Sequence, residues 1–239
     1  MTATQLILAT VLMAVGACVQ GSVGFGMGLM TAPLLTLIDP AYVPAPVLMA
    51  SMPLSAMVAV RERRSLDYRG LGWAFAGRVP GTVAGVAAVA LLPDTEMAVL
   101  FGVVVLTAVV LTWAGWYFRP TPRTLVTAGV ASGFMGTATS IGGPPIALVY
   151  QHEEGPRLRS TLATFFVLGA TFSIVSLAVG GEVDGHSVAL GLSLLPGMLL
   201  GFVLSGPVTR HLDRGHTRTA VLVLSATAAV AVIVKEVVG

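Results

Sequence analysis

Long apolar stretches separated by short polar turns make up most of the chain. A helix that crosses a bilayer needs roughly 20 apolar residues, and the stretches come close to this length or exceed it. They are Thr4–Ile38, Ala45–Val60, Gly70–Leu92, Met97–Phe118, Leu125–Tyr150, Ser160–Gly180, Ser187–Pro207 and Thr217–Val234. None shows the ten-residue polar and apolar alternation of a membrane β-barrel strand. The pattern predicts an all-α polytopic membrane protein.

The composition changes which classes of protein remain open. Apolar residues make up 55% of the 239 positions and charged residues only 10%, whereas soluble domains carry about 25% charged residues. The polar surface is too small to cover a water-soluble globule, which excludes a soluble enzyme and a nucleic-acid-binding domain. The net charge is only +2, and the basic residues form short clusters between apolar stretches, a pattern typical of membrane topology. We therefore expect the lipid bilayer as a partner and no nucleic acid.

Chemistry-bearing motifs are few. The single cysteine, Cys18, excludes a disulfide framework and a cysteine-based metal site. Metal-protease, phosphate-loop and nucleophile-elbow motifs are missing, so we expect no enzyme and no cofactor. No Asp or Glu lies inside an apolar stretch, so the chain lacks the buried carboxylate relay of many proton-coupled pumps. The start at Met1 has no basic region, and a cleaved signal peptide is not expected.

The two halves of the chain repeat each other. Pro80-Gly81 and Gly85 recur as Pro196-Gly197 and Gly201, and the glycine run around Gly26 recurs around Gly142. The offset is 116 residues in both cases. Such duplications are common in secondary transporters. We predict a first membrane repeat over residues 1–118 and a second over residues 119–239, within one membrane domain.

The arginine distribution favours re-entrant segments. If all the stretches cross the membrane, the loops divide the basic residues seven to five, which conflicts with the positive-inside tendency. If the first and fifth stretches enter and leave on one side, eleven arginines share one face, and the other keeps only Lys235. Each repeat is then a broken-helix hairpin plus three transmembrane helices, and the second repeat is inverted. Eight full crossings remain the alternative.

The glycine-rich breaks are the candidate binding elements. Gly21–Gly28 interrupts the first stretch and Gly142–Pro145 interrupts the fifth. A helix that starts at mid-membrane directs free N–H groups and a positive dipole end inward, which suits an anion. Close helix packing is the competing interpretation of these glycines. The candidate substrate-binding residues at the breaks are Gln20, Ser22, Gly24, Gly26, Gly28, Thr137, Thr139, Ser140, Gly142 and Gly143.

Arg78 is the ionisable residue that lies well inside an apolar stretch. Charge inside a membrane is costly and usually functional, so Arg78 joins the candidate substrate-binding residues. The competing interpretation is a side chain that extends to the arginine-rich face. The glycine pairs Gly81/Gly85 and Gly197/Gly201 are most simply helix-packing motifs. Ser51 and Ser55 in the second stretch could line a cavity, although such hydroxyls often bond to their own helix.

The duplicated motifs resemble the TauE/SafE family of sulfite and organosulfonate exporters. The resemblance rests on Gly21-Ser-Val-Gly-Phe-Gly-Met-Gly-Leu-Met-Thr-Ala-Pro33, on Gly133–Pro145, on Pro196–Gly201 and on Arg210–Arg214. It covers nearly the whole chain. The resemblance implies a secondary transporter of sulfite, sulfoacetate or related sulfonates across the bacterial inner membrane. It also implies that the direction of transport is export.

The residues themselves support an anion as substrate but do not specify sulfur. A small carboxylate would satisfy the same donors, and a passive anion channel could have the same architecture. A homodimer is compatible with this interpretation.

Overall fold

The computed structural model describes residues 2–114, 116 and 118–211, and its regular elements there are helices. In chain order these are α1 (Ala3–Val23), α2 (Met27–Ile38), α3 (Ala45–Arg61), α4 (Tyr68–Leu91), α5 (Asp94–Ala114), α6 (Pro122–Thr139), α7 (Gly143–Tyr150), α8 (Gly155–Val179) and α9 (Gly185–His211). Short 3-10 turns cover Pro40–Tyr42 and Arg63–Ser65. The predicted stretch Thr217–Val234 lies outside the described residues.

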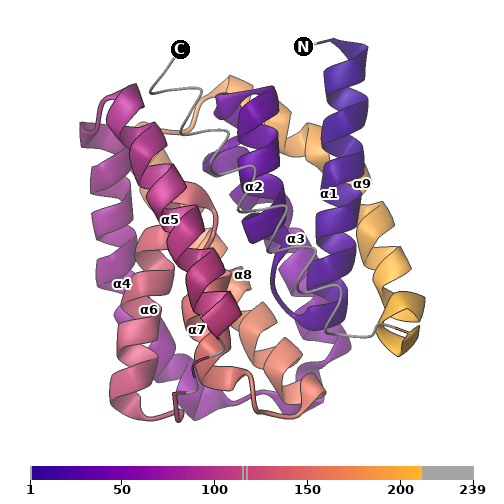
Figure 1. Ribbon diagram of the computed structural model, residues 1–239, viewed down its shortest axis with the longest axis vertical. Coiled ribbons are helices and arrows are strands. Elements are labelled where there is room, and N and C mark those ends of the chain that lie inside the picture. The colour runs from indigo at the N-terminus through magenta and orange to yellow at the C-terminus, as the bar shows by residue number, and fades with distance from the viewer. Residues whose placement is uncertain (1, 115, 117, 212–239) are drawn as a thin grey trace.

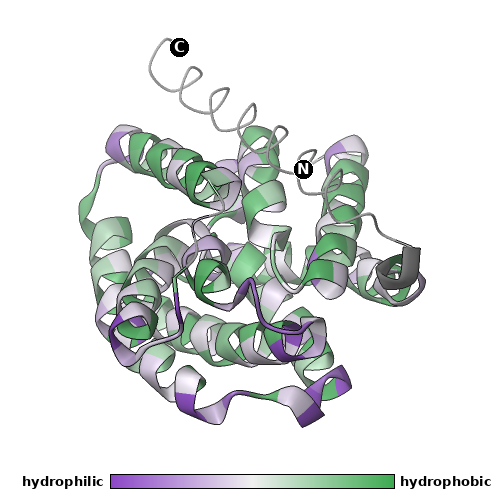
Figure 2. Ribbon diagram, turned by 60° about the horizontal axis from the view of Figure 1, so that its bottom comes forward, coloured by the Kyte–Doolittle hydropathy of each residue, from purple (hydrophilic) through white to green (hydrophobic). Residues whose placement is uncertain are grey.

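The helices are those of a multi-pass membrane protein. In the described part of the chain, six helical segments are long and apolar enough to cross a bilayer: Ala3–Val23, Pro40–Arg61, Tyr68–Leu91, Asp94–Ala114, Gly155–Val179 and Gly185–Val208. Many large apolar side chains are exposed on their outer faces, among them Val83, Val103 and Leu192. Figure 2 shows this hydrophobic colour along the helices, with hydrophilic residues gathered in loops and helix ends. The all-α membrane prediction is confirmed.

The first apolar stretch is broken at its glycines. Gly24 ends α1 and Gly26 starts α2, with φ angles of 104° and 113°. Such positive φ angles are open to glycine and cost energy for other residues. The chain therefore leaves α1 and enters α2 through two left-handed residues. The predicted interruption within Gly21–Gly28 is confirmed.

The fifth stretch is broken at the equivalent point. Ser140 ends α6 with a φ of 62°, and Gly142 precedes the first turn of α7. A left-handed conformation in a residue other than glycine stores strain, and such residues cluster at functional sites. The Ser140 hydroxyl donates to the Pro44 carbonyl at 2.8 Å, which ties this break to the start of α3.

Glycines allow two pairs of helices to pack closely. α4 packs along α6, and α1 packs along α9. A Cβ added at Gly81 would overlap the Val130 backbone oxygen of α6, and one at Gly197 would overlap the Thr10 backbone oxygen of α1. Small residues bring membrane helices close enough for such backbone contacts. The packing interpretation of these motifs is confirmed.

The arginine-rich connections of the chain lie at one end of the helix bundle (Figure 1). In Figure 1 the α3–α4 and α7–α8 connections lie at the bottom, and the α4–α5 and α8–α9 connections lie at the top. At the bottom end an ion pair joins α8 to the end of α3, because Arg159 contacts Glu62 at 3.0 Å. The site described next lies between the two broken segments.

Candidate functional site

A cavity lies where the two helix breaks meet, and the space inside it for water-sized atoms is about 40 Å³. A single water needs roughly 10–15 Å³ of such space, so the cavity has room for only a few water molecules or one small anion. The breaks come close together, because a Cβ at Gly28 of α2 would overlap the Ser140 backbone oxygen. Helices α3, α4 and α8 complete the wall through Ser51, Arg78 and Phe166. Residues from both halves of the chain therefore build one cavity.

Arg78 is the charged residue of the cavity wall. Its side chain is 2% exposed, and its Nη1 donates to the Ser132 hydroxyl at 3.3 Å. The guanidinium carbon lies 4.9 Å from the centre of the Phe165 ring. Its Nε is buried and has no hydrogen-bond partner, and no carboxylate among the described residues pairs with it. Arg78 is thus a buried cation that faces a cavity, and the alternative of a side chain extending to the arginine-rich face does not hold.

Arg61 lies near the first break, and hydrogen bonds within the protein use both of its terminal nitrogens. Its Nη1 donates to the Ser205 hydroxyl at 3.1 Å, and its Nη2 donates to the Gly21 carbonyl near the end of α1. Glu62 lies 3.8 Å from its Nε. A cation at a helix C-terminus meets the unpaired carbonyls and the negative dipole end, which is favourable. Arg61 uses its donors within the protein, whereas Arg78 keeps one donor free.

The two helix N-termini at the cavity differ in the donors they present. The first turn of α2, Met27–Leu29, lines the cavity, and the N–H groups of a first turn have no acceptor within their own helix. The first turn of α7 starts with Gly143 and continues with two prolines, which carry no N–H. The α2 end therefore presents more N–H donors to the cavity than the α7 end. The sequence repeat predicts two equivalent ends, so this difference is not expected from it.

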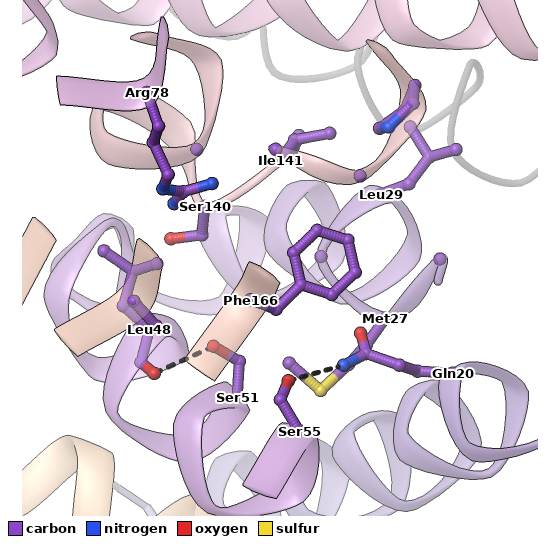
Figure 3. A pocket seen from close by; sticks show the side chains of 17 residues that line it. Gln20, Met27, Leu29, Leu48, Ser51, Ser55, Arg78, Ser140, Ile141 and Phe166 are labelled. Atoms are coloured by element: carbon purple, nitrogen blue, oxygen red, sulfur yellow. Dashed lines mark hydrogen bonds between the residues drawn. The ribbon is translucent and has the colours of Figure 1, made fainter. Parts of the chain in front are cut away.

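The cavity wall opposite Arg78 is partly polar and partly apolar. Gln20 Nε2 donates to the Ser55 hydroxyl at 3.1 Å, and the Ser51 hydroxyl donates to the Leu48 carbonyl at 2.8 Å. Figure 3 shows these groups in the lower part of the view and the guanidinium of Arg78 at upper left, with Ser140 beside the guanidinium and Phe166 to the right.

The chain matches the family model described as Sulfite exporter TauE/SafE over residues 8–232. The protein belongs to the TauE/SafE family. No curated protein and no solved structure matches the chain. TauE/SafE proteins form a family of sulfite and sulfur-anion exporters, so the chain belongs to a transporter family. The apolar helices agree with that membership.

Most residues predicted to bind substrate in this TauE/SafE chain come together at the cavity. Its wall includes Gln20, Gly26, Gly28, Arg78, Ser140, Gly142 and Gly143. The structure places the other four elsewhere. The Ser22 hydroxyl donates to the Ser205 carbonyl at 3.2 Å, and Gly24 packs against Arg159. Thr137 and Ser173 share a hydrogen bond of 2.7 Å, and the Thr139 hydroxyl donates to the Met135 carbonyl at 2.7 Å.

Sequence reasoning missed the residues that surround the Arg78 guanidinium. Ser132 accepts from Arg78 and donates to the Gly142 carbonyl, which links the cation to the second break. Phe165 and Gly169 of α8 lie against the same guanidinium. Ser132 falls ten residues before Gly142, and nothing in its local sequence distinguishes it from an ordinary helix serine. The one available signal is the small residues that recur at helical spacing on α6 and α8, which indicate where these helices approach a neighbour closely.

Proposed function

We propose that this TauE/SafE chain is a secondary transporter that exports small sulfur-containing anions, such as sulfite, sulfoacetate or related sulfonates, across the bacterial inner membrane. The anion binds in the cavity between the two helix breaks. Arg78 supplies the charge, and the N–H groups of Met27, Gly28 and Gly143 supply further donors. Ser140 and Gln20 line the same space. Substrate reaches either face by rocking of the two halves about this site.

The unpaired buried cation carries this proposal. An arginine in a low-dielectric interior costs several kcal/mol unless an anion or hydrogen-bond acceptors compensate it. Arg78 has one hydrogen bond at 3.3 Å, one aromatic neighbour and a free Nε. A sulfonate or sulfite oxygen is a good acceptor for a guanidinium edge, because charge-assisted hydrogen bonds are the stronger ones. Arg78 lines the cavity, so an anion there would compensate the charge of the guanidinium, although Nε itself lies against Gly169.

The proposed architecture is two inverted repeats, over residues 1–118 and 119–239, each a re-entrant hairpin plus three transmembrane helices. The helix pairs support it: if α6 repeats α1 and α9 repeats α4, the packed pairs α1–α9 and α4–α6 are equivalent. An inverted repeat also requires equivalent loops to lie at opposite ends of the bundle. The α3–α4 connection lies at the bottom of Figure 1 and the equivalent α8–α9 connection at the top. In this arrangement the arginine-rich end faces the cytoplasm, as the positive-inside rule requires.

A binding screen on the purified protein tests the proposed substrate class. The ligands are sulfite, sulfoacetate and methanesulfonate, compared with acetate, malonate, chloride and sulfate at equal ionic strength. We expect saturable binding of the sulfur-containing anions and clearly weaker binding of the others. Stronger binding of acetate or malonate would assign the site to small carboxylates. Binding of none of these anions would contradict an anion site at Arg78.

A further inference from the structure

The Arg78 guanidinium lies in a slot that exists because residue 169 has no side chain. Gly169 lies in the buried face of α8. A Cβ added there would overlap the Nε and Cζ atoms of Arg78 and lie 2.6 Å from its Nη2. Real Cβ atoms do not approach other heavy atoms this closely, so any side chain at position 169 displaces the guanidinium.

The other walls of the slot come from two further residues. Phe165 precedes Gly169 by one helical turn on α8, and its ring faces the guanidinium carbon at 4.9 Å. Ser132 of α6 accepts the hydrogen bond from Nη1 on the other side. Gly136 lies one turn beyond Ser132, and a Cβ there would be 3.3 Å from Nη2. The guanidinium is therefore confined on several sides while its Nε stays unpaired.

We propose that Gly169 is a positioning residue for anion recognition: its missing side chain creates the slot that holds the Arg78 guanidinium at the cavity wall. This inference rests on the proposed function, because it assigns Gly169 a role in holding the residue that binds the anion. A planar guanidinium recognises an anion by geometry as well as by charge, so its orientation matters. Gly169 acts through Arg78 and does not itself line the cavity.

A double-mutant cycle tests the proposal with sulfite as the probe. The variants are Gly169→Ala, Arg78→Ala and the double variant, measured in detergent for sulfite affinity and for the midpoint of thermal unfolding. We expect Gly169→Ala to weaken sulfite binding at least tenfold and to lower the unfolding midpoint. In the Arg78→Ala background, where sulfite binding is already lost, the same substitution should leave the midpoint unchanged or raised, because the new methyl fills vacated space. Coupling of this kind is expected for residues in contact.

The control is Gly72→Ala, because Gly72 is exposed on α4 and a Cβ there has no neighbour within 4 Å. This variant should match the wild-type protein in affinity and unfold at the same temperature or slightly higher, because alanine is favoured over glycine in a helix. If Gly169→Ala gives no folded protein, recovery of folded protein in the double variant supports the slot, and failure to recover it contradicts the slot.

Equal effects of Gly169→Ala in both backgrounds, or unchanged sulfite affinity in the single variant, would overturn the positioning role. Absence of sulfite binding by the wild-type protein would contradict the proposed function instead. The thermal cycle would still decide whether position 169 accommodates the guanidinium, so the two failures are distinguishable.

Discussion

Replacement of Arg78 by methionine separates a ligand-binding cation from a structural one. Methionine is apolar, flexible and similar in length, so it can fill the slot without a charge. Arg78 has no carboxylate partner among the described residues and leaves one nitrogen unpaired. Replacing buried charges by apolar residues of similar volume is often neutral or stabilising. We therefore expect Arg78→Met to unfold at the same temperature as the ligand-free wild-type protein or at a higher one.

The effect on anion binding should be opposite and large. Arg78→Met removes a charge-assisted hydrogen bond from a desolvated site, which costs on the order of 2–4 kcal/mol, or about 30- to 1,000-fold in affinity. Arg78→Lys keeps the charge but loses the planar pair of donors, so its loss should be smaller than that of methionine. Arg78→Ala should lose binding as completely as methionine does.

Thermal unfolding with and without sulfite measures both quantities in one experiment. A ligand at 100 times its dissociation constant stabilises the folded state by about 2.7 kcal/mol. Sulfite should thus raise the unfolding midpoint of the wild-type protein, raise that of Arg78→Lys less, and raise that of Arg78→Met least, because a site about 30- to 1,000-fold weaker gains less than about 1 kcal/mol at this concentration. A midpoint for ligand-free Arg78→Met well below the wild-type value, together with a preserved response to sulfite, would show that Arg78 is structural and would refute this reasoning.

Two further predictions concern packing and topology. Gly81→Ala should destabilise the protein by about 1–3 kcal/mol, because its methyl group would overlap the α6 backbone; exposed Gly72→Ala should not destabilise it, and equal unfolding midpoints for the two variants would contradict the packing role. Cysteines placed at Ala41 and at Glu154 in a Cys18→Ala background should react with membrane-impermeant reagent from opposite sides of intact vesicles. Labelling of both positions from one side would contradict the inverted-repeat proposal.

The helix breaks could be predicted from sequence because they depend on local backbone chemistry. Gly24 and Gly26 adopt the left-handed conformations that glycine permits, and Pro144 stands at the start of α7, where its missing N–H costs little. The sequence predicts Ser140 as a hydroxyl donor at the second break but does not predict its left-handed conformation. The hydroxyl of Ser140 also makes a tertiary hydrogen bond to the Pro44 carbonyl, which no local sequence pattern indicates.

The surroundings of the site depend on packing between distant segments and could not be predicted in the same way. Helical spacing alone does not fix which face of a helix meets the cavity when most faces are apolar. Thr137 illustrates this, because it lies on a predicted break yet bonds to Ser173 of α8. For Arg78 the sequence allows two orientations, toward the cavity or toward the arginine-rich face. The slot beside Gly169 depends on the packing of α8 against α4, which the sequence does not specify.

Flux measured in liposomes reconstituted with the purified protein tests the central claim most directly. Sulfite is loaded inside, an ion or pH gradient is imposed, and sulfite movement is followed over a range of concentrations. The account predicts saturable flux that a gradient can drive against the sulfite concentration, that methanesulfonate inhibits, and that Arg78→Met abolishes. Flux that rises linearly with concentration and never runs uphill would identify a passive channel. Wild-type flux that Arg78→Met leaves intact would contradict the anion site described here.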